Sequence, residues 1–259
     1  MITCKLQGGL GNQLFQVSTA YALALRNSDN LVINPNNHHP SYINGANRHI
    51  TQYINNIFRN IEFANIQHIS EIYREPEFSY SEIAYEKDML IEGYFQSEKY
   101  FVDCREELLN LFSIDKQNKA YILQNYGDIL KGLTVSIHVR RGDYIKYSDI
   151  HPICTKDYYI KAMAAMPSNA LYLVFSDDIE WCLRNFTLNQ FKIIDEDDII
   201  SLYLMSMCNH HILANSSFSW WGAWLNSDAN KRVVVPKKWF GASASYSTKD
   251  LIPDGWNTI

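Results

Sequence analysis

The sequence predicts an α/β protein that is built around parallel β-sheet. In the second half of the chain, short apolar runs alternate with helical segments of about ten to fifteen residues, the pattern of β-α-β units. These runs are apolar at successive positions, as in strands that are buried on both faces of a sheet. The expected strands are residues 135–139, 171–175, 191–194, 211–214 and 233–235.

The first half of the chain opens with the pattern of a strand, a turn and a helix. Residues 2–6 form a short apolar run, and the glycines among residues 8–11 predict a tight turn. From Asn12 to Leu25, apolar residues recur at helical spacing. The other expectations for this half are strands at 31–33 and from 89 to 91, a helix at 97–111, and loops with short helices at 34–76.

The regular alternation begins after Lys131, which divides the chain into two predicted domains, 1–131 and 132–259. A chain of 259 residues is long for one domain, since domains commonly contain about 150 residues. We expect the last residues to pack back on the first domain.

Composition excludes several classes of protein. With 23 Lys and Arg against 28 Asp and Glu, the net charge of −5 argues against a nucleic-acid partner. A hydrophobic content of 47% is too high for a disordered chain. No apolar run approaches the roughly 18 residues of a transmembrane segment, and no signal-peptide pattern opens the chain. Five scattered cysteines without a Cys-x-x-Cys pair indicate reduced thiols, and we expect a cytoplasmic protein.

The strongest chemical signal is the run His-Val-Arg-Arg-Gly-Asp-Tyr at residues 138–144. On the strand before it, alternate side chains point to opposite faces, which places His138 and Arg140 on the face opposite Val139. In open α/β sheets, ligands bind beyond the carboxyl ends of the strands, and Arg side chains suit phosphate. We therefore predict that Arg140 and Arg141 bind phosphate. The alternative is an ion pair with Asp143, and both can hold because there are two arginines.

Two further strands also end in polar residues. Residues 171–175 run into Ser176, Asp177 and Asp178, and residues 211–214 run into Asn215 and several serines. In a parallel sheet these ends lie at one edge. For Asp178 we favour a helix cap. For Ser216 and Ser217 we favour phosphate binding at a helix N-terminus over capping. Trp220, Trp221 and Trp224 follow, and helix packing explains them better than ligand stacking.

The glycine turn at residues 8–13 lacks the spacing of a dinucleotide fingerprint. It predicts only that a strand turns tightly into a helix. Asn12 and Gln13 at the start of that helix are suitably placed to hydrogen-bond a sugar or phosphate.

A metal site is the alternative use of residues 195–198, which read Asp-Glu-Asp-Asp. Asp195 and Asp197 form an Asp-x-Asp pair of the kind that holds a divalent cation. We favour a solvated acidic turn that caps the following helix, and predict no metal and no cofactor. His210 and His211 are adjacent on a strand, point to opposite faces, and do not predict a metal site.

Together these segments resemble the bacterial α-1,2-fucosyltransferases of glycosyltransferase family 11. The resemblance runs nearly end to end. It rests on residues 8–16 (GGLGNQLFQ), 92–101 (EGYFQSEKYF), 138–144 (HVRRGDY), 175–178 (FSDD), 215–226 (NSSFSWWGAWLN), 236–240 (PKKWF) and 250–256 (DLIPDGW).

The resemblance implies a GT-B fold, in which two Rossmann-like domains with parallel sheets face across a cleft. Residues 1–131 would form the acceptor-side domain and residues 132–259 the domain that binds the donor, GDP-β-L-fucose. Fucose would be transferred with inversion and without a metal to the 2-hydroxyl of a terminal β-galactoside in a surface glycan of the O-antigen type. A lipid-linked acceptor would bring the cytoplasmic protein to the inner membrane.

The resemblance also implies roles for particular residues. Arg140 would hold the β-phosphate, His138 would contact the nucleotide, and Asn12 would lie near the transferred sugar. The Ser-Ser-Phe turn, here Ser216, Ser217 and Phe218, would line the diphosphate. The remaining donor-binding candidates are Arg141, Asp177, Gly9, Gly11 and Gln13.

One position departs from the family pattern. Family members usually carry Asp at the start of the helix that precedes the NSSFSWW turn, where it is a plausible partner for guanine. The equivalent residue here is Ser201, and Asp198, one turn upstream, is the candidate replacement.

The predicted mechanism follows from charge development. Breaking the fucosyl–phosphate bond leaves negative charge on GDP, which a fixed Arg140 stabilises. A single displacement needs one base for the acceptor proton, and Asp143 is the candidate; orientation of Arg141 is its alternative role. Two other functions stay open: a metal-dependent sugar-nucleotide transferase that uses Asp195 and Asp197, and a non-catalytic GDP-sugar-binding protein.

Overall fold

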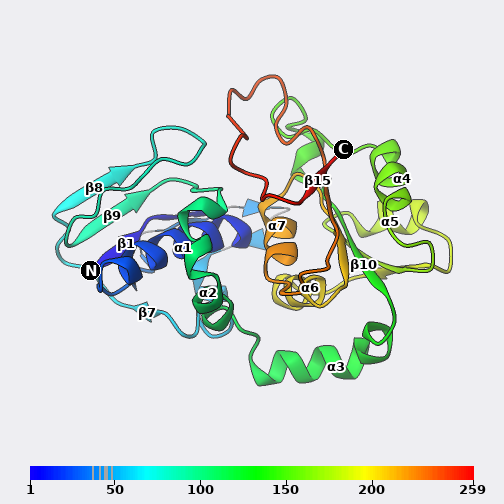
Figure 1. The fold of residues 1–259 in the computed structure, drawn as a ribbon, viewed down its shortest axis with the longest axis horizontal. Coiled ribbons are helices and arrows are strands. Elements are labelled where there is room, and N and C mark those ends of the chain that lie inside the picture. The colour runs from blue at the N-terminus through cyan, green and yellow to red at the C-terminus, as the bar shows by residue number, and fades with distance from the viewer. Residues whose placement is uncertain (37, 41, 44–45, 48) are drawn as a thin grey trace. The chain divides into compact units, whose positions relative to one another are not determined.

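The computed structural model describes residues 1–36, 38–40, 42–43, 46–47 and 49–259. The chain divides into two compact units (Figure 1). The first contains Met1–Ile114 and Tyr246–Pro253, and the second contains Asp115–Ser245 and Asp254–Ile259. The boundary precedes helix α3 (Lys116–Leu130), which the sequence analysis placed in the first domain. This helix packs against α6 (Asp198–Ser206) of the second unit.

The first unit is built on a three-stranded parallel sheet with the order β1-β9-β8. Its strands are β1 (Ile2–Cys4), β9 (Met89–Glu92) and β8 (Glu71–Arg74). The strand predicted at residues 2–6 is divided, because β2 (Leu6–Gly8) pairs with a different strand, β4 (His38–Pro40). Helix α1 (Leu10–Arg26) follows and packs on β1 and β2 with a largely buried face.

The helix predicted at residues 97–111 is interrupted. Ser97 is a cap as expected, since its hydroxyl accepts from the Lys99 N–H, but it caps the short 3-10 helix η2 (Glu98–Tyr100). A second 3-10 helix, η3 (Val102–Cys104), and then α2 (Arg105–Leu111) complete the segment. The break lies at Phe101, whose backbone has φ −150° and whose ring is fully buried. The chain therefore buries this ring instead of forming the continuous helix that the pattern predicts.

The second unit contains a six-stranded sheet with the order β12-β11-β10-β13-β14-β15, and every neighbouring pair is parallel. All five strands predicted for this half are present, which confirms the expected parallel sheet. The short polar strand β15 was not predicted because it lacks an apolar run. The strands are β10 (Thr134–Val139), β11 (Leu171–Ser176), β12 (Phe191–Ile194), β13 (His210–Ile212), β14 (Val233–Val235) and β15 (Asn257–Thr258).

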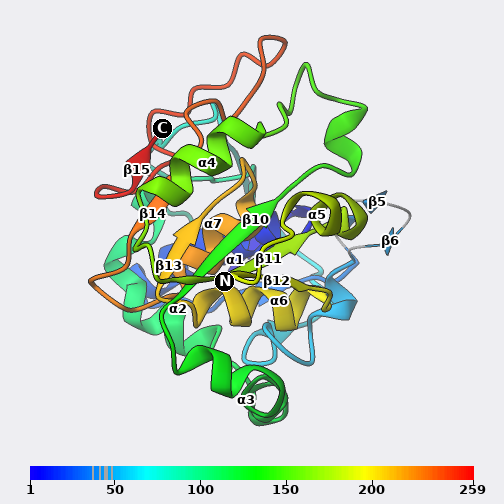
Figure 2. The ribbon, with the colours of Figure 1, turned by 90° about the vertical axis from the view of Figure 1, so that its right-hand side faces the viewer.

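Helices cover this sheet (Figure 2). The apolar residues of β10, Val135, Ile137 and Val139, pack in one core cluster with residues of α4 (Lys156–Ala164) and α5 (Ile179–Asn185). The other face of β10 carries Ser136 and His138, as strand alternation predicts. Helices α6 and α7 (Ser217–Trp224) pack against each other. The three indoles of α7 are buried, which confirms that they belong to the core.

The segment at residues 34–76 forms short strands as well as turns, and its positions 37, 41, 44, 45 and 48 lie outside the described residues. Among the residues described, no helix is long and apolar enough to cross a bilayer. The remaining elements are β3 (Val32–Ile33), β5 (Tyr42–Ile43), β6 (Ala46–Asn47), β7 (Glu62–Phe63), η1 (Ile50–Gln52) and η4 (Asp143–Ile145).

Candidate active site

The candidate site lies at the carboxyl edge of the sheet in the second unit. Because β10 is parallel to both β11 and β13, the polar residues that follow these three strands meet at one edge, as predicted. Strand β12 is parallel to β11 and ends at the same edge, where the acidic run 195–198 begins.

Arg140 is the most constrained cation at this edge. Its Nη1 lies 2.7 Å from an Asp177 carboxylate oxygen, and its Nη2 lies 2.5 Å from one of Asp143. The guanidinium also lies over the Tyr144 ring, 5.0 Å from its centroid. The side chains of Arg140 and Asp177 are each 13% exposed, and that of Asp143 is 33% exposed. Asp177 is thus the more buried partner of Arg140, and Asp143 the more accessible one.

Arg141 has a separate set of partners. Its Nε donates to Asp178 at 3.0 Å, and its guanidinium stacks over the Trp181 ring at 4.5 Å. Its backbone N–H donates to Asp177 at 2.9 Å. Asp178 also caps α5 by accepting from the Trp181 N–H, which confirms its predicted capping role. Asp143, in contrast, forms its ion pair with Arg140. The alternative role predicted for Asp143 was to orient Arg141, and the arginine that it contacts is Arg140 instead.

The edge therefore holds two guanidiniums and three carboxylates, from Asp143, Asp177 and Asp178. Two positive and three negative charges leave this cluster one charge negative. Because like charges repel, a diphosphate binds here more favourably if it displaces a carboxylate from a guanidinium. The accessible Asp143 is the partner that can leave at the lowest cost in buried contacts.

His138 is buried on the face of β10 toward α7. Burial, with a smaller contribution from the charge of Arg140, lowers the pKa of its imidazole to about 3, so the ring is neutral. Its Nδ1 is buried and has no hydrogen-bond partner among the described residues. The ring lies 5.7 Å from that of Phe218, centroid to centroid. A neutral imidazole with an unused nitrogen at this edge is suited to a polar ligand.

The turn before α7 is fixed to the arginine-bearing segment. Tyr144 donates its hydroxyl to the Asn215 carbonyl at 3.0 Å, and its ring stacks on His151. The Asn215 side-chain amide donates to the carbonyls of Pro152 and Trp239, both at 3.0 Å. These contacts place the N-terminus of α7 near Arg140. The sequence analysis assigned no role to Tyr144, although the resemblance motif contains it.

Ser216 is the N-cap of α7, since its hydroxyl accepts from the Phe218 N–H. Capping is the role that the sequence analysis ranked second for this residue. Ser217 and Phe218 form the first turn of the helix and are half-buried. The helix N-terminus adds a favourable field for an anion.

The acidic run 195–198 acts as a turn and cap. Asp197 caps α6 by accepting from the Ile200 N–H at 2.8 Å, and Glu196 accepts from the hydroxyls of Tyr121 and Tyr126. Asp198 is the first residue of α6, and Ser201 lies one turn further, where its hydroxyl donates to the Glu196 carbonyl. In the part of the chain that the structure describes, no group of three or more His, Cys, Asp or Glu side chains has a metal-binding arrangement.

His211 has a structural role. One imidazole nitrogen, Nε2, lies 2.9 Å from the Asn226 amide nitrogen, and Nδ1 lies 2.8 Å from the Ser136 hydroxyl. The amide nitrogen is a donor, so Nε2 accepts and Nδ1 donates. Burial lowers the pKa of His211 to about 3.

In the first unit, the glycine turn brings polar side chains together. Gln13 donates to the Gly8 carbonyl at 3.0 Å, and Asn12 accepts from the Gln96 amide at 2.9 Å. Gly8 has φ +77°, and a Cβ there would lie 2.3 Å from the Asn12 amide nitrogen. Glycine is therefore required for this approach. Gly9 caps α1 with its backbone alone, and Gly11 is buried within the helix.

Glu75 is a residue that sequence reasoning missed. Its two carboxylate oxygens accept from the backbone N–H groups of Tyr94 (2.7 Å) and Phe95 (3.0 Å). Burial raises the pKa of Glu75, and these two hydrogen bonds oppose the rise. Phe95 has φ +51°, a left-handed conformation that is unfavourable for a bulky residue. Glu75 thus holds the turn 93–96, which carries Gln96 to Asn12. No local pattern marks Glu75, because it directly follows β8 in the segment 34–76, where loops and short helices were expected.

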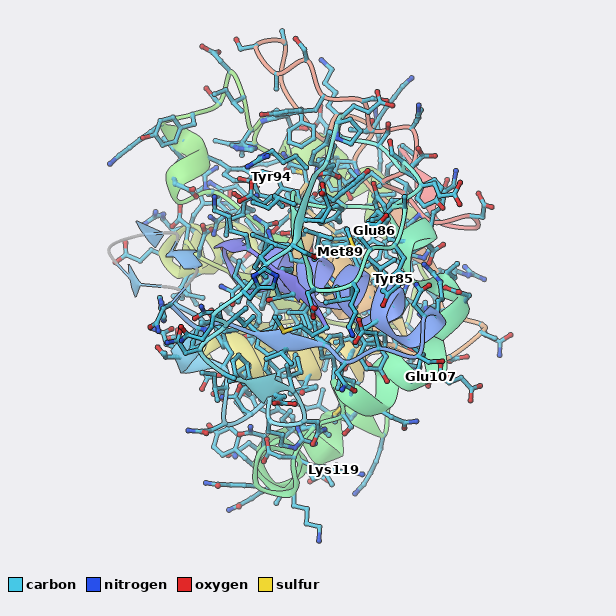
Figure 3. The ribbon with its side chains drawn as sticks, turned by 90° about the vertical axis from the view of Figure 1, so that its left-hand side faces the viewer. Tyr85, Glu86, Met89, Tyr94, Glu107 and Lys119 are labelled. Atoms are coloured by element: carbon cyan, nitrogen blue, oxygen red, sulfur yellow. The ribbon has the colours of Figure 1, made fainter. Side chains whose placement is uncertain are left out.

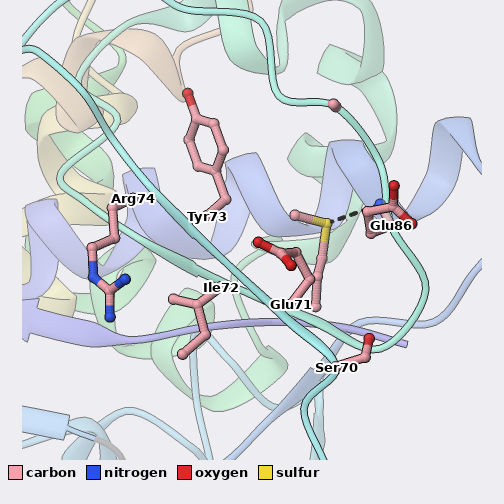
Figure 4. Close-up of a pocket in the computed structure, with 8 residues that line it drawn as sticks. Ser70, Glu71, Ile72, Tyr73, Arg74 and Glu86 are labelled. Carbon is pink, nitrogen blue, oxygen red and sulfur yellow. Dashed lines mark hydrogen bonds between the residues drawn. The ribbon is translucent and has the colours of Figure 1, made fainter.

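The first unit also has a cleft of about 460 Å³ along β8, lined by Ser70, Glu71, Ile72, Tyr73, Arg74, Ala84, Glu86 and Met89 (Figure 4). The hydrogen bond drawn there runs from the Glu86 N–H to the Met89 sulfur at 3.3 Å. None of the predicted site residues lines this cleft.

Comparison with known proteins identifies the class to which this fold and site belong. The family described as glycosyl transferase family 11 matches residues 1–259. The chain therefore belongs to glycosyl transferase family 11, as the resemblance predicts.

The chain is also similar to named bacterial and mammalian proteins. An alpha-1,2-colitosyltransferase of Escherichia coli is 29% identical over all of this chain and 99% of its own length. The O-antigen biosynthesis glycosyltransferase WbnK of Escherichia coli is 30% identical, over 99% of both chains. Galactoside 2-alpha-L-fucosyltransferase SEC1 of Bos taurus is 24% identical over 87% of this chain and 64% of its own length.

Solved fucosyltransferase structures share the fold. NodZ alpha-1,6-fucosyltransferase soaked with GDP-fucose matches with a TM-score of 0.52 at 14% identity, over 86% of this chain and 92% of that one. POFUT1 in complex with GDP-fucose also gives 0.52, at 10% identity over 88% and 94%. These similarities confirm the predicted α/β fold of the GT-B type.

Proposed function

We propose that this protein is an inverting galactoside α-1,2-fucosyltransferase. Its donor is GDP-β-L-fucose, and its acceptor is the 2-hydroxyl of a terminal β-galactoside in a glycan of the O-antigen type. The observation that carries the proposal is the pair Arg140 and Arg141 at the carboxyl edge of the sheet, next to the N-terminus of α7. Use of this donor is supported by structural neighbours that were soaked with GDP-fucose or are in complex with it. The α-1,2 linkage is supported by a relative named for α-1,2 transfer. The class of acceptor glycan is supported by a relative named for O-antigen synthesis.

In this proposal the second unit binds the donor. The diphosphate takes the place of Asp143 on Arg140, while the buried Asp177 keeps the guanidinium oriented. Ser217 and Phe218 at the start of α7 line the diphosphate, and the unused nitrogen of His138 contacts the nucleotide. Asp198 at the start of α6 is the candidate partner for guanine. Ser201 lies one helical turn after it. Arg140 is then bonded to the oxygens on which negative charge develops as the fucosyl–phosphate bond breaks, which lowers the barrier.

The displaced Asp143 supplies the base. Once it is released from Arg140, its carboxylate is free to take the proton of the attacking acceptor hydroxyl, as a single displacement requires. The products are GDP and the α-fucoside. Asn12, with Gln96, is the candidate for binding the transferred sugar. A lipid-linked acceptor would bring this protein, acting in the cytoplasm, to the inner membrane surface.

The test is release of GDP from GDP-fucose with and without lactose, in buffer that contains EDTA. We expect lactose-dependent release that survives EDTA, because the arginines neutralise the diphosphate. Release that requires a divalent cation would favour the alternative that uses Asp195 and Asp197. Binding of GDP-fucose without transfer to any galactoside would favour a sugar-nucleotide-binding protein.

One relative favours a second candidate donor. It is named for colitosyl transfer, and colitose is fucose without its 3-hydroxyl. The same diphosphate site would serve GDP-colitose, so the two donors differ only at the sugar. Competition between GDP-fucose and GDP-colitose in one reaction gives the ratio of their kcat/KM values, and a ratio above one for fucose supports the primary proposal.

A further inference from the structure

The surface of the first unit carries a cluster of three aromatic side chains, Phe78, Tyr94 and Tyr246. The Phe78 ring lies 5.2 Å from that of Tyr246 and 6.5 Å from that of Tyr94, centroid to centroid. Tyr94 is 37% exposed and Tyr246 is 54% exposed. Figure 3 labels Tyr94. Three rings from distant parts of the sequence thus meet at solvent, where exposed apolar clusters commonly mark a binding site.

The backbone beneath two of these rings is held in place. The Tyr94 N–H donates to the Glu75 carboxylate. The segment that follows Tyr246 is fastened by Asp250, which forms an ion pair with Lys99 at 2.5 Å and accepts from the Tyr80 N–H at 3.1 Å. A fixed platform of this kind binds a ligand at a smaller entropic cost than mobile side chains do.

The aromatic cluster is linked through the backbone of one turn to polar residues of the glycine turn. Tyr94 and Gln96 belong to the same turn at residues 93–96, and Gln96 donates to Asn12. The Gln96 amide is thus held two residues from Tyr94 along the same turn. Sugar rings present an apolar C–H face and polar edges, which suits an aromatic surface bordered by amides.

We propose that Phe78, Tyr94 and Tyr246 form the binding platform for the acceptor galactoside, with Tyr94 and Tyr246 in contact with the sugar. The inference rests on the proposed function, since it assigns the acceptor of that reaction to these residues. It names acceptor-binding side chains, which the sequence analysis did not assign.

The test measures acceptor and donor kinetics separately. Tyr94→Ala and Tyr246→Ala should each raise KM for lactose about tenfold or more, and leave KM for GDP-fucose within about twofold. Tyr94→Trp and Tyr246→Phe retain an aromatic ring and should keep KM for lactose near the wild-type value. Tyr85→Ala is the matched control, because Tyr85 is a tyrosine of the first unit whose hydroxyl donates to Asp29, outside both proposed sites.

Saturation-transfer NMR with lactose and GDP provides a readout independent of turnover. Galactose proton signals that appear with wild-type protein and disappear with Tyr94→Ala support the platform, even if wild-type protein transfers no fucose and the proposed function fails. The inference is overturned if the alanine variants keep the wild-type KM for lactose, if donor and acceptor KM rise equally, or if wild-type protein gives no galactoside signal.

Discussion

At the scale of single residues, Arg140 is held by the carboxylates of Asp143 and Asp177 at the proposed donor site. We expect Arg140→Ala to lower kcat/KM for GDP-fucose about 100-fold or more, because it removes a charge-assisted contact to the departing phosphate. Steady-state transfer to lactose measures this effect. Thermal unfolding of the variant must be recorded alongside, since the change also removes the ion pair between Arg140 and Asp177. Near-normal turnover by a folded variant would rule out the role assigned to Arg140.

Asp143 provides a second prediction at this scale. Asp143→Asn retains an oxygen that can accept from Arg140 but removes the proposed proton acceptor. We expect kcat to fall about 100-fold while the Kd for GDP changes only a few-fold. Calorimetry with GDP and initial rates with lactose separate the two quantities. Asp149→Asn is the control, because Asp149 is an exposed carboxylate nearby in sequence. An unchanged kcat would show that Asp143 is not the base and that its role is limited to the ion pair with Arg140.

His211 predicts a pH dependence of stability. Its pKa is about 3 in the folded protein, below the usual value of 6.5, so the unfolded chain binds the proton more readily. The stabilisation is therefore complete above pH 6.5 and is lost as the pH falls toward 3. Between about pH 7.5 and about pH 5 this group should contribute roughly 2 kcal/mol to the loss of unfolding free energy.

Urea unfolding at the two pH values tests this expectation. His211→Gln should show a smaller loss of stability on acidification than the wild-type protein. His68→Gln should show the wild-type loss, because His68 is exposed. Equal pH dependence in all three proteins would contradict the buried neutral state of His211. His138, which is also buried and neutral, adds a loss of the same sign in each protein.

At the scale of elements, the turn 93–96 depends on Glu75. A methyl at Gly93 would lie 2.4 Å from Glu75 Cβ, so the two segments are in close contact. Glu75→Gln replaces one accepting oxygen with an NH₂ group that faces a backbone N–H. We expect kcat for transfer to fall about tenfold or more, with GDP affinity unchanged, because Gln96 is displaced from Asn12.

Initial rates and GDP calorimetry on the same preparation measure the two effects of Glu75→Gln. Glu71→Gln is the control on the preceding strand β8, since Glu71 is exposed. Wild-type kcat in Glu75→Gln would show that the turn does not depend on this carboxylate.

Elements of the second unit could be predicted because each strand is a short apolar run with its own boundary. Elements of the first unit were harder to predict. The run at residues 2–6 contains no signal that its two ends pair with different strands, and the helical pattern at residues 97–111 contains no signal that burial of Phe101 interrupts it. Both outcomes are decided by contacts with residues far away in the sequence.

At the scale of the whole molecule, the metal requirement is the simplest property to measure. We expect the transfer rate in EDTA to remain within about twofold of the rate in Mg²⁺, because fixed guanidiniums neutralise the diphosphate. The comparison uses wild-type protein and Asp195→Asn. Asp195 is exposed and should tolerate the change. Loss of activity in EDTA together with loss in Asp195→Asn would establish the metal-dependent alternative.

The sequence by itself determined the parallel sheet, the polar strand ends at one edge, the indole core of α7 and the family. These follow from local patterns and motifs, which a linear chain displays directly. Only the tertiary structure decided that Arg140 is shared by Asp143 and Asp177, that Glu75 holds the turn 93–96, and that Phe78, Tyr94 and Tyr246 meet. Such partners are set by the pairing of distant segments, where burial and hydrogen bonding select among many contacts that the sequence allows.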